Sequence, residues 1–313
     1  MPFNSKPQKF NASIKAVEIG VGDKAITLGG ENVFPFYTFD APIENAPKVG
    51  VLLTDLGLLN PTQGLTDFYG EGASVVDMAK KVSEMEGADF IYLSLEGGDP
   101  NGENKSTEEL VALAKDVADA TDLPLVVAGS KNVDKDSELL PKVAEALQGK
   151  NVVIMPAKEE NYKAVGAAAG LAYNQKLGAE SAVDINLAKQ LNVVTTQLGV
   201  KPESIVMNVG TAAAGYGYEY VVSTMDRIKA AALSQDDAML QMPILTPVAT
   251  ETWNVKESVA SEEDMPEWGS REERAISMEI MTAAADLVSG SNAVVLQHPQ
   301  SVATIAKMIK ELI

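Results

Sequence analysis

From residue 49 onward, short apolar segments alternate with segments that have the spacing of amphipathic helices. The apolar segments are 49–55, 90–97, 124–130, 151–157, 181–186, 204–210, 241–248 and 293–299. The helical segments are 74–87, 106–121, 137–149, 160–175, 187–199, 221–233, 272–290 and 300–313. Eight such units in about 265 residues come close to the ~250 residues typical of a (β/α)₈ barrel.

The apolar segments are continuous rather than alternating, as parallel strands covered on both faces must be. We therefore predict one TIM barrel over residues 49–313. A doubly wound open sheet is the alternative, but no glycine-rich turn follows the first strand to mark a topological switch point. Residues 1–48 form an N-terminal arm, in which two β-branched runs flank Gly22-Asp23 and predict a hairpin. Since a hairpin leaves an exposed sheet edge, we expect a partner chain to cover it.

Charge and residue content exclude several classes of function. The chain has 25 Lys and Arg against 44 Asp and Glu, a net charge of −19, so neither nucleic acid nor an anionic membrane surface is an expected partner. It has no cysteine and one histidine, His298, which excludes cysteine-ligated clusters and histidine-rich metal sites within this chain. The first residues lack the apolar core of a signal peptide, so we expect a cytoplasmic protein.

The functional loops of such a barrel follow its strands at their C-terminal ends. Two of these loops, 56–73 and 249–272, are unusually long, and the second holds Trp253 and Trp268. Each tryptophan could offer a surface to a flat ligand or a partner, or could simply pin its loop to the barrel. The sequence leaves both alternatives open.

Polar residues at the predicted strand ends would converge at the barrel mouth. They are Asp55, Glu96, Asp99, Asp184, Asn186, Asn208, Glu251 and His298. Two carboxylates could act as an acid–base pair, but strand-end Asp and Asn also cap the following helix, and nothing fixes a pair within reach. We therefore predict no catalytic residue and no metal ligand. His298 is expected to form hydrogen bonds that orient the last loop.

The stretch NVGTAAAGYGYEY, residues 208–220, joins a predicted strand to a predicted helix. Its glycines permit either the close approach of a large object or a backbone with positive φ. The loop thus either accepts a broad ligand or only turns tightly.

Six stretches, taken together, resemble one family. They are LGGENVFPFYTFD (28–40), EENYKAV (159–165), DINLAKQLN (184–192), GYGYEY (215–220) with MDRIKAAAL (225–233), PEWGSREER (266–274) and QHPQSV (297–302). Over nearly its whole length the chain resembles the small subunit of the corrinoid iron–sulfur protein, the delta subunit of the CO dehydrogenase/acetyl-CoA synthase complex.

The resemblance implies a non-catalytic TIM-barrel subunit that pairs with a large subunit. The large subunit carries a [4Fe–4S] cluster and a cobalamin domain, and the cobalamin lies between that domain and this barrel. A separate methyltransferase supplies a methyl group from methyltetrahydrofolate, and acetyl-CoA synthase/CO dehydrogenase receives it in the reductive acetyl-CoA (Wood–Ljungdahl) pathway. The alternatives are a free-standing pterin-binding methyltransferase barrel and a purely structural subunit.

The resemblance also implies a set of corrinoid contacts. Gly215 and Gly217 would allow the close approach, with Thr211 and Tyr216 at the edge of the ring. Asn208 stands where related sequences tend to carry an acidic residue, and its amide could still bond the amides of the corrin. The full set of expected cofactor-binding residues is Asp184, Asn186, Asn208, Gly210, Thr211, Gly215, Tyr216, Gly217, Thr250 and Trp253.

Overall fold

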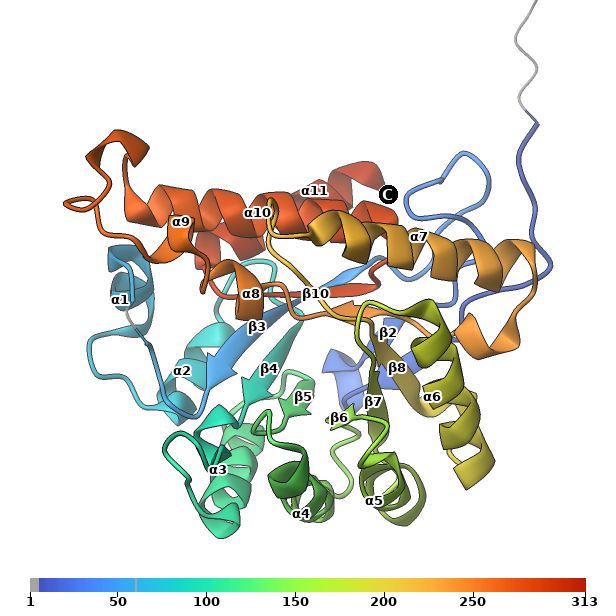
Figure 1. The fold of residues 1–313 in the computed structure, drawn as a ribbon, viewed down its shortest axis with the longest axis horizontal. Helices are drawn as coiled ribbons and strands as arrows, with labels where there is room; N and C mark the ends of the chain where they lie inside the picture. The colour runs from blue at the N-terminus through green and yellow to red at the C-terminus, as the bar shows by residue number, and fades with distance from the viewer. Residues whose placement is uncertain (1–5, 60) are drawn as a thin grey trace, which may run out of the picture.

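The computed structural model describes residues 6–59 and 61–313, and its centre is a ring of eight parallel strands (Figure 1). In chain order they are β3 (Lys48–Thr54), β4 (Phe90–Ser94), β5 (Leu125–Ala128), β6 (Val153–Ala157), β7 (Lys176–Glu180), β8 (Ile205–Asn208), β9 (Leu245–Thr246) and β10 (Ala293–Leu296). The sheet runs in the order β8-β7-β6-β5-β4-β3-β10-β9. A parallel bridge between Met207 and Ile244 brings the two end strands together. The predicted (β/α)₈ barrel is confirmed, and the open sheet is excluded.

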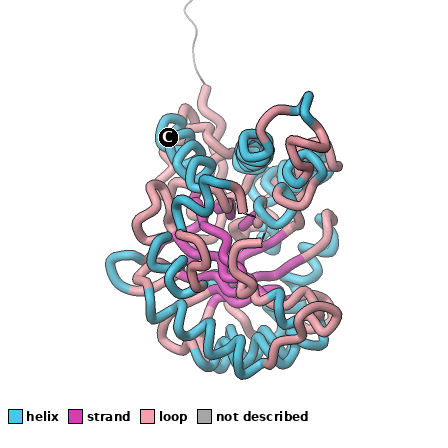
Figure 2. The backbone as a smooth tube through the Cα atoms, turned by 90° about the vertical axis from the view of Figure 1, so that its left-hand side faces the viewer, coloured by secondary structure: helices cyan, strands magenta, loops and turns pink. Residues whose placement is uncertain are grey.

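Helices surround the strands on the outside (Figures 1 and 2). They are α2 (Val75–Val82), α3 (Thr107–Ala120), α4 (Val133–Ala146), α5 (Tyr162–Gly166), α6 (Ile185–Leu198), α7 (Tyr218–Ser234), α10 (Arg271–Ser289) and α11 (Pro299–Leu312). A π-helical turn, Ala167–Ala172, extends α5. Ser106 caps α3 by accepting the Glu109 N–H. Among the described residues, no helix is both long and apolar enough to cross a bilayer.

Two predicted boundaries are wrong. The fifth barrel strand is 176–180 rather than 181–186, because KLGAE lacks the β-branched residues that made SAVDIN look like a strand. The segment 181–184 is a loop that ends at the cap of α6. Helix α4 begins at residue 133 rather than 137, since the Asn132 side chain accepts the Lys135 N–H and caps it there.

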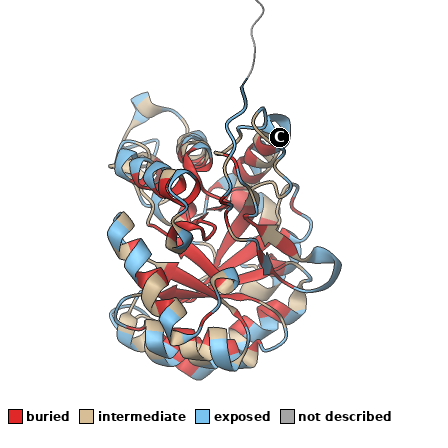
Figure 3. Cartoon of the chain, turned by 90° about the vertical axis from the view of Figure 1, so that its right-hand side faces the viewer, coloured by how far each residue is buried: buried red, intermediate tan, exposed pale blue. Residues whose placement is uncertain are grey.

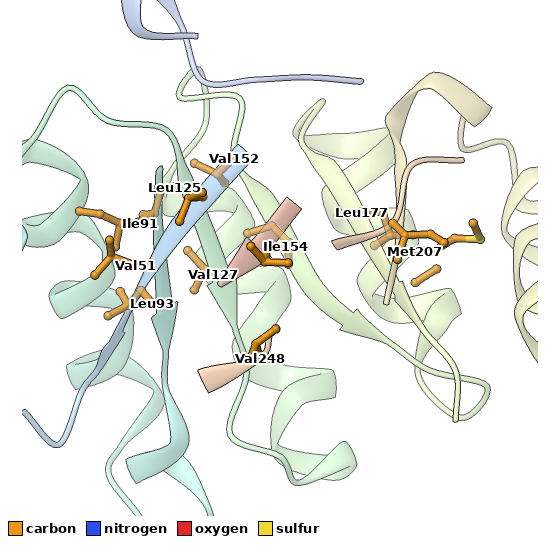
Figure 4. Packing of buried hydrophobic residues seen from close by; sticks show 14 of the residues in the cluster. Val51, Ile91, Leu93, Leu125, Val127, Val152, Ile154, Leu177, Met207 and Val248 are labelled. Carbon is orange, nitrogen blue, oxygen red and sulfur yellow. The ribbon is translucent and has the colours of Figure 1, made fainter. Parts of the chain in front are cut away.

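Both faces of the sheet are buried. Between sheet and helices lie Val51, Ile91, Leu93, Val127 and Ile154 (Figure 4), and these residues form part of the apolar layer that the helices cover. The outer helices are exposed on their far side (Figure 3). Full burial explains the continuous apolar runs in the sequence.

The hairpin closes the N-terminal end of the barrel. Strands β1 (Val17–Ile19) and β2 (Ile26–Leu28) pair antiparallel around a short 3₁₀ turn, Gly22–Lys24, as predicted. The side chains of Val17, Ile19, Ile26 and Leu28 are buried in one cluster with inward-facing barrel residues such as Phe90 and Val153. Our expectation that a partner chain must cover the hairpin is therefore corrected, because the barrel itself covers its apolar face.

The two long loops lie beside the C-terminal ends of the strands, and both fold locally. The first contains α1 (Gln63–Tyr69). The second contains α8 (Ala249–Thr252), α9 (Lys256–Val259) and a 3₁₀ turn, Pro266–Trp268. The described parts of both loops are thus ordered structures at the end of the barrel where function is expected.

Candidate functional site

A cavity of about 610 Å³ opens at the C-terminal mouth of the barrel. The ends of β4 to β8 and the residues that follow β9 surround it. Its lining consists of Tyr92, Ser94, Ala128, Gly129, Lys131, Pro156, Lys158, Glu159, Glu160, Glu180, Ser181, Ala182, Leu187, Asn208, Gly210, Thr211, Pro247, Thr250 and Glu251. We call this space the mouth cavity.

A hydrogen-bonded chain fixes Asn208 at the end of β8. Its Nδ2 donates to Glu180 Oε2 at 2.9 Å, and Glu180 Oε1 lies 3.0 Å from Lys158 Nζ. The Asn208 Oδ1 accepts the Gly210 N–H at 3.0 Å, which sets the orientation of the amide and the start of the glycine-rich loop. One N–H and one lone pair of Asn208 remain available.

Two hydroxyl groups in the cavity wall have no partner. The Oγ of Ser181 and the Oγ1 of Thr211 are buried, and neither forms a hydrogen bond with any described residue. Both residues line the mouth cavity, directly after β7 and β8 respectively. Buried polar groups are normally hydrogen-bonded, so these two hydroxyls are exceptions that need an explanation.

A second cavity of about 210 Å³ adjoins the first between the two long loops. It shares Ser94, Lys131 and Thr250 with the mouth cavity, and Leu58 and Trp253 make part of its wall apolar. The two spaces therefore form one continuous surface across the mouth, polar on one side and apolar on the other.

The charged rim of the mouth is largely paired within the chain. Lys131 Nζ lies 2.8 Å from Glu96 Oε2, as Lys158 pairs with Glu180. Partial burial raises the pKa of Glu251, and the nearby Lys131 partly offsets this. The acidic lining residues outnumber the lysines, so the rim does not favour an anion.

Trp253 belongs to a clasp between the two long loops. Its Nε1 donates to Glu279 Oε1 at 2.9 Å, and its ring stacks on that of His298, with centroids 6.2 Å apart and planes 10° apart. The His298 Nε2 lies 3.0 Å from Glu272 Oε1, which also accepts the Gly64 N–H at 2.7 Å. Trp253 therefore both pins its loop and lines a cavity, so the two alternatives hold together.

His298 and Trp268 have structural contacts of their own. The His298 Nδ1 accepts the Gln300 N–H and caps α11, the orienting role expected of it. Burial lowers the pKa of His298, against the opposing effect of Glu272. Trp268 lies under Lys256 and Arg274, at 5.0 and 5.6 Å from its ring centroid.

The structure brings together half of the residues expected to bind a cofactor. Asn208, Gly210, Thr211 and Thr250 line the mouth cavity, and Trp253 lines its neighbour. The others lie outside both cavities, and they are Asp184, Asn186, Gly215, Tyr216 and Gly217.

Several of these outer residues have a local explanation. Asp184 Oδ1 accepts the N–H groups of Asn186 and Leu187, so it caps α6. The exposed Tyr216 donates its hydroxyl to Glu257 Oε2 at 2.6 Å. Gly217 has φ +88° and immediately precedes α7, the tight-turn alternative for the glycine-rich loop. The cofactor role of all five stays a prediction.

Sequence reasoning missed four polar residues of the mouth, namely Lys131, Lys158, Glu180 and Ser181. Placing the fifth strand one segment too late hid Glu180 and Ser181, because the strand end was then expected at residue 186. Asp55, in contrast, accepts the Gly97 N–H at 2.8 Å and lies 3.0 Å from Lys105, so it is a structural residue. Within the described part of the chain, no group of three or more His, Asp or Glu residues could hold a metal ion.

The closed eight-stranded ring with a polar mouth is a barrel of the dihydropteroate synthase type. It superimposes on 7,8-dihydropteroate synthase from Vibrio fischeri ES114 with a TM-score of 0.57 and 11% identity, covering 95% of this chain and 98% of that one. The enzyme from Thermus thermophilus gives 0.55 and 12%, covering 95% and 100%. A dihydropteroate synthase in complex with pteroic acid, from Coxiella burnetii, gives 0.54 and 13%, covering 90% and 100%. At these identities the similarity establishes the fold alone.

The family follows from sequence comparison. A family model described as CO dehydrogenase/acetyl-CoA synthase delta subunit matches residues 16–295, and the chain belongs to this family. Acetyl-CoA decarbonylase/synthase complex subunit delta 2 of Methanosarcina acetivorans is 32% identical over 298 residues, covering 94% of this chain and 67% of that protein. Subunit delta of Archaeoglobus fulgidus is 31% identical over 299 residues, covering 94% and 65%. The chain thus spans about two thirds of the length of these relatives.

Proposed function

We propose that this chain is the non-catalytic barrel subunit of a corrinoid methyl carrier, in which its mouth faces a cobalamin carried by a large iron–sulfur subunit. The methyl group would come from methyltetrahydrofolate through a separate methyltransferase and pass to acetyl-CoA synthase/CO dehydrogenase. When bound, the corrinoid supplies the cobalt centre that carries the methyl group. Membership of the delta subunit family supports assembly into such a complex.

One observation carries the proposal to the mouth of the barrel. The wall of the mouth cavity holds groups that both donate and accept hydrogen bonds and are not fully used within the chain, namely the amide of Asn208 and the hydroxyls of Ser181 and Thr211. The periphery of a corrin carries neutral amide side chains, which need both donors and acceptors. These residues therefore fit the group.

The remaining residues of the mouth would bind and orient rather than react. Glu180 and Lys158 hold the Asn208 amide in one orientation, and the clasp at Trp253 holds both long loops beside the apolar part of the mouth. Leu58 and Trp253 would exclude water from that side. No proton transfer by the chain is needed for this role.

A pterin-binding methyltransferase is the second candidate, because the fold is that of dihydropteroate synthases and because Glu180 and Asn208 stand side by side at adjacent strand ends. A carboxylate next to an amide could bind the aminopyrimidinone edge of a pterin. The two candidates differ in what the isolated chain should bind.

The test is to purify the chain alone and after co-expression with the large subunit. We expect the isolated chain to lack iron and corrinoid, and the co-expressed pair to form a 1:1 complex with the visible spectrum of a corrinoid. Isothermal titration of the isolated chain with methyltetrahydrofolate provides the second arm. Stoichiometric cobalamin on the isolated chain would contradict a shared site, and micromolar pterin binding would favour the methyltransferase.

A further inference from the structure

We propose that Ser181 and Thr211 form a subsite for a neutral carboxamide group in the wall of the mouth cavity. The inference rests on the proposed function, because the carboxamide would belong to the periphery of the corrinoid. Asn208, which lines the same wall, would be the third member of the subsite.

The sheet register places the two hydroxyl-bearing residues on neighbouring loops. Glu180 and Asn208 are paired across β7 and β8, so Ser181 follows one strand by one residue and Thr211 follows the other by three. The Ser181 N–H donates to the Asn208 carbonyl oxygen at 2.9 Å, which holds the start of both loops together.

Gly210 keeps the loops in contact beyond this point. A Cβ atom at Gly210 would lie 3.1 Å from Val183 Cγ2 and 4.0 Å from the Ser181 carbonyl oxygen, and its φ of +89° suits glycine. The two loops therefore pack directly on each other, and Ser181 and Thr211 both line the same cavity.

The burial of both hydroxyl oxygens argues for a ligand. Ser181 is only 4% exposed, and neither its Oγ nor the Thr211 Oγ1 has a hydrogen-bond partner in the described chain. Leaving such a group unpaired disfavours the folded state, whereas an apolar replacement would avoid the penalty. Because the staggered rotamers of Ser and Thr place the hydroxyl in different directions, rotation about Cα–Cβ can turn each toward the cavity without backbone movement.

The surroundings select the chemical class of the ligand. Four carboxylates line the cavity, and its two lysines are already paired with Glu96 and Glu180, so an anion would be repelled. A cation would use only acceptors and would leave the hydroxyl protons unpaired. A carboxamide donates two hydrogen bonds and accepts two, which matches hydroxyl groups that do both.

The experiment measures hydroxocobalamin binding by equilibrium dialysis to the reconstituted complex of the full chain with its large subunit. We expect Ser181→Ala and Thr211→Val each to weaken binding about 3- to 10-fold, and the double variant about 10- to 100-fold. Thr211→Ser keeps the hydroxyl and should stay within about twofold of wild type. Thr195→Val is the matched control, because Thr195 has a buried, unpartnered hydroxyl in α6 and does not line the mouth cavity.

Urea unfolding of the free chain separates a binding role from a structural one. Since neither hydroxyl forms a hydrogen bond in the chain, the midpoints of Ser181→Ala and Thr211→Val should stay unchanged or rise. Weaker corrinoid binding together with a clearly lowered midpoint would make the hydroxyls structural and overturn the subsite.

The ligand class is tested with cobalamin monocarboxylic acids, in which one peripheral amide is hydrolysed. At least one of them should bind wild type more weakly than hydroxocobalamin, and this difference should shrink in the double variant. If the double variant forms the complex and binds hydroxocobalamin as wild type does, the subsite is refuted while the proposed function stands. If the wild-type complex binds no better than the large subunit alone, the proposed function itself fails before any variant is compared.

Discussion

Replacing Lys229 with methionine should destabilise the whole barrel, although Lys229 lies far along the chain from the arm that it binds. Its Nζ donates to Glu31 Oε1 and to Asn292 Oδ1, both at 2.9 Å, and Asn292 Nδ2 donates to the same Glu31 oxygen at 2.8 Å. The side chains of Lys229 and Glu31 are 2% and 10% exposed. This buried group joins the N-terminal arm to α7 and to the start of β10.

The magnitude follows from what Lys229→Met removes and leaves behind. Two charge-assisted hydrogen bonds, each worth about 1.5–3 kcal/mol, are lost. The Glu31 carboxylate then remains buried without its cation, and breaking a buried pair in this way costs about 3–5 kcal/mol in total. Lys229→Met with Glu31→Gln removes both charges and keeps an acceptor for Asn292, so the double variant should be more stable than Lys229→Met alone.

Urea unfolding followed by circular dichroism measures the free energies, and limited trypsin digestion reports whether the arm is released at Lys15 or Lys24. Lys15→Met is the matched control, since Lys15 pairs with Glu203 at 3.9 Å on the exposed surface and should contribute no more than about 1 kcal/mol. A loss below about 1 kcal/mol in Lys229→Met, or strict additivity in the double variant, would refute the view that this pair holds the arm to the barrel.

Three further predictions concern single residues. Burial without a charged partner raises the pKa of Asp286 to about 8, so its contribution to stability is full below the unfolded pKa and is lost as the pH rises toward 8. Asp286→Asn should therefore flatten the urea stability curve between about pH 5 and 8, by up to about 1.4 kcal/mol per pH unit, and an unchanged slope would contradict this. His298→Ala removes the cap of α11 and the bond to Glu272, which should cost about 1–2 kcal/mol in urea unfolding while the corrinoid spectrum of the complex stays the same; a shifted spectrum would implicate His298 at the cobalt. Gly217→Val should cost about 1–3 kcal/mol because φ is +88°, whereas Gly217→Asn should fold normally; if Asn lowers corrinoid retention in the folded complex, the loop faces the cofactor, and if both variants retain it, the loop does not.

The barrel could be predicted from the sequence because its strands and helices each have a local signal. Parallel strands buried on both faces must be continuously apolar, and β3, β4 and β10 meet this requirement plainly. Strand β7 does not, since Lys176 and Glu180 flank a short run that contains glycine. Its identity as a strand depends on pairing with β6 and β8, which is a tertiary effect that periodicity cannot reveal.

The covering of the hairpin also depended on tertiary structure. Its alternating pattern of Val17 and Ile19 against Ile26 and Leu28 predicted a strand pair with one apolar face, but the sequence could not say what that face would meet. The open N-terminal end of the barrel supplies the contact.

For the mouth of the barrel, the rule that functional side chains stand at the C-terminal ends of strands selected more residues than the site contains. Asp55 and Asp184 are both strand-end carboxylates, yet the N–H groups of their own or neighbouring loops occupy them. Asn208 is partly occupied, because Glu180 and Gly210 use one donor and one lone pair. The hydroxyls of Ser181 and Thr211 have no partner among the described residues. What distinguishes the candidate site is therefore hydrogen-bonding capacity that the fold leaves unused, and that property is decided by neighbours 28 residues away, as between Asn208 and Glu180, rather than by residue type.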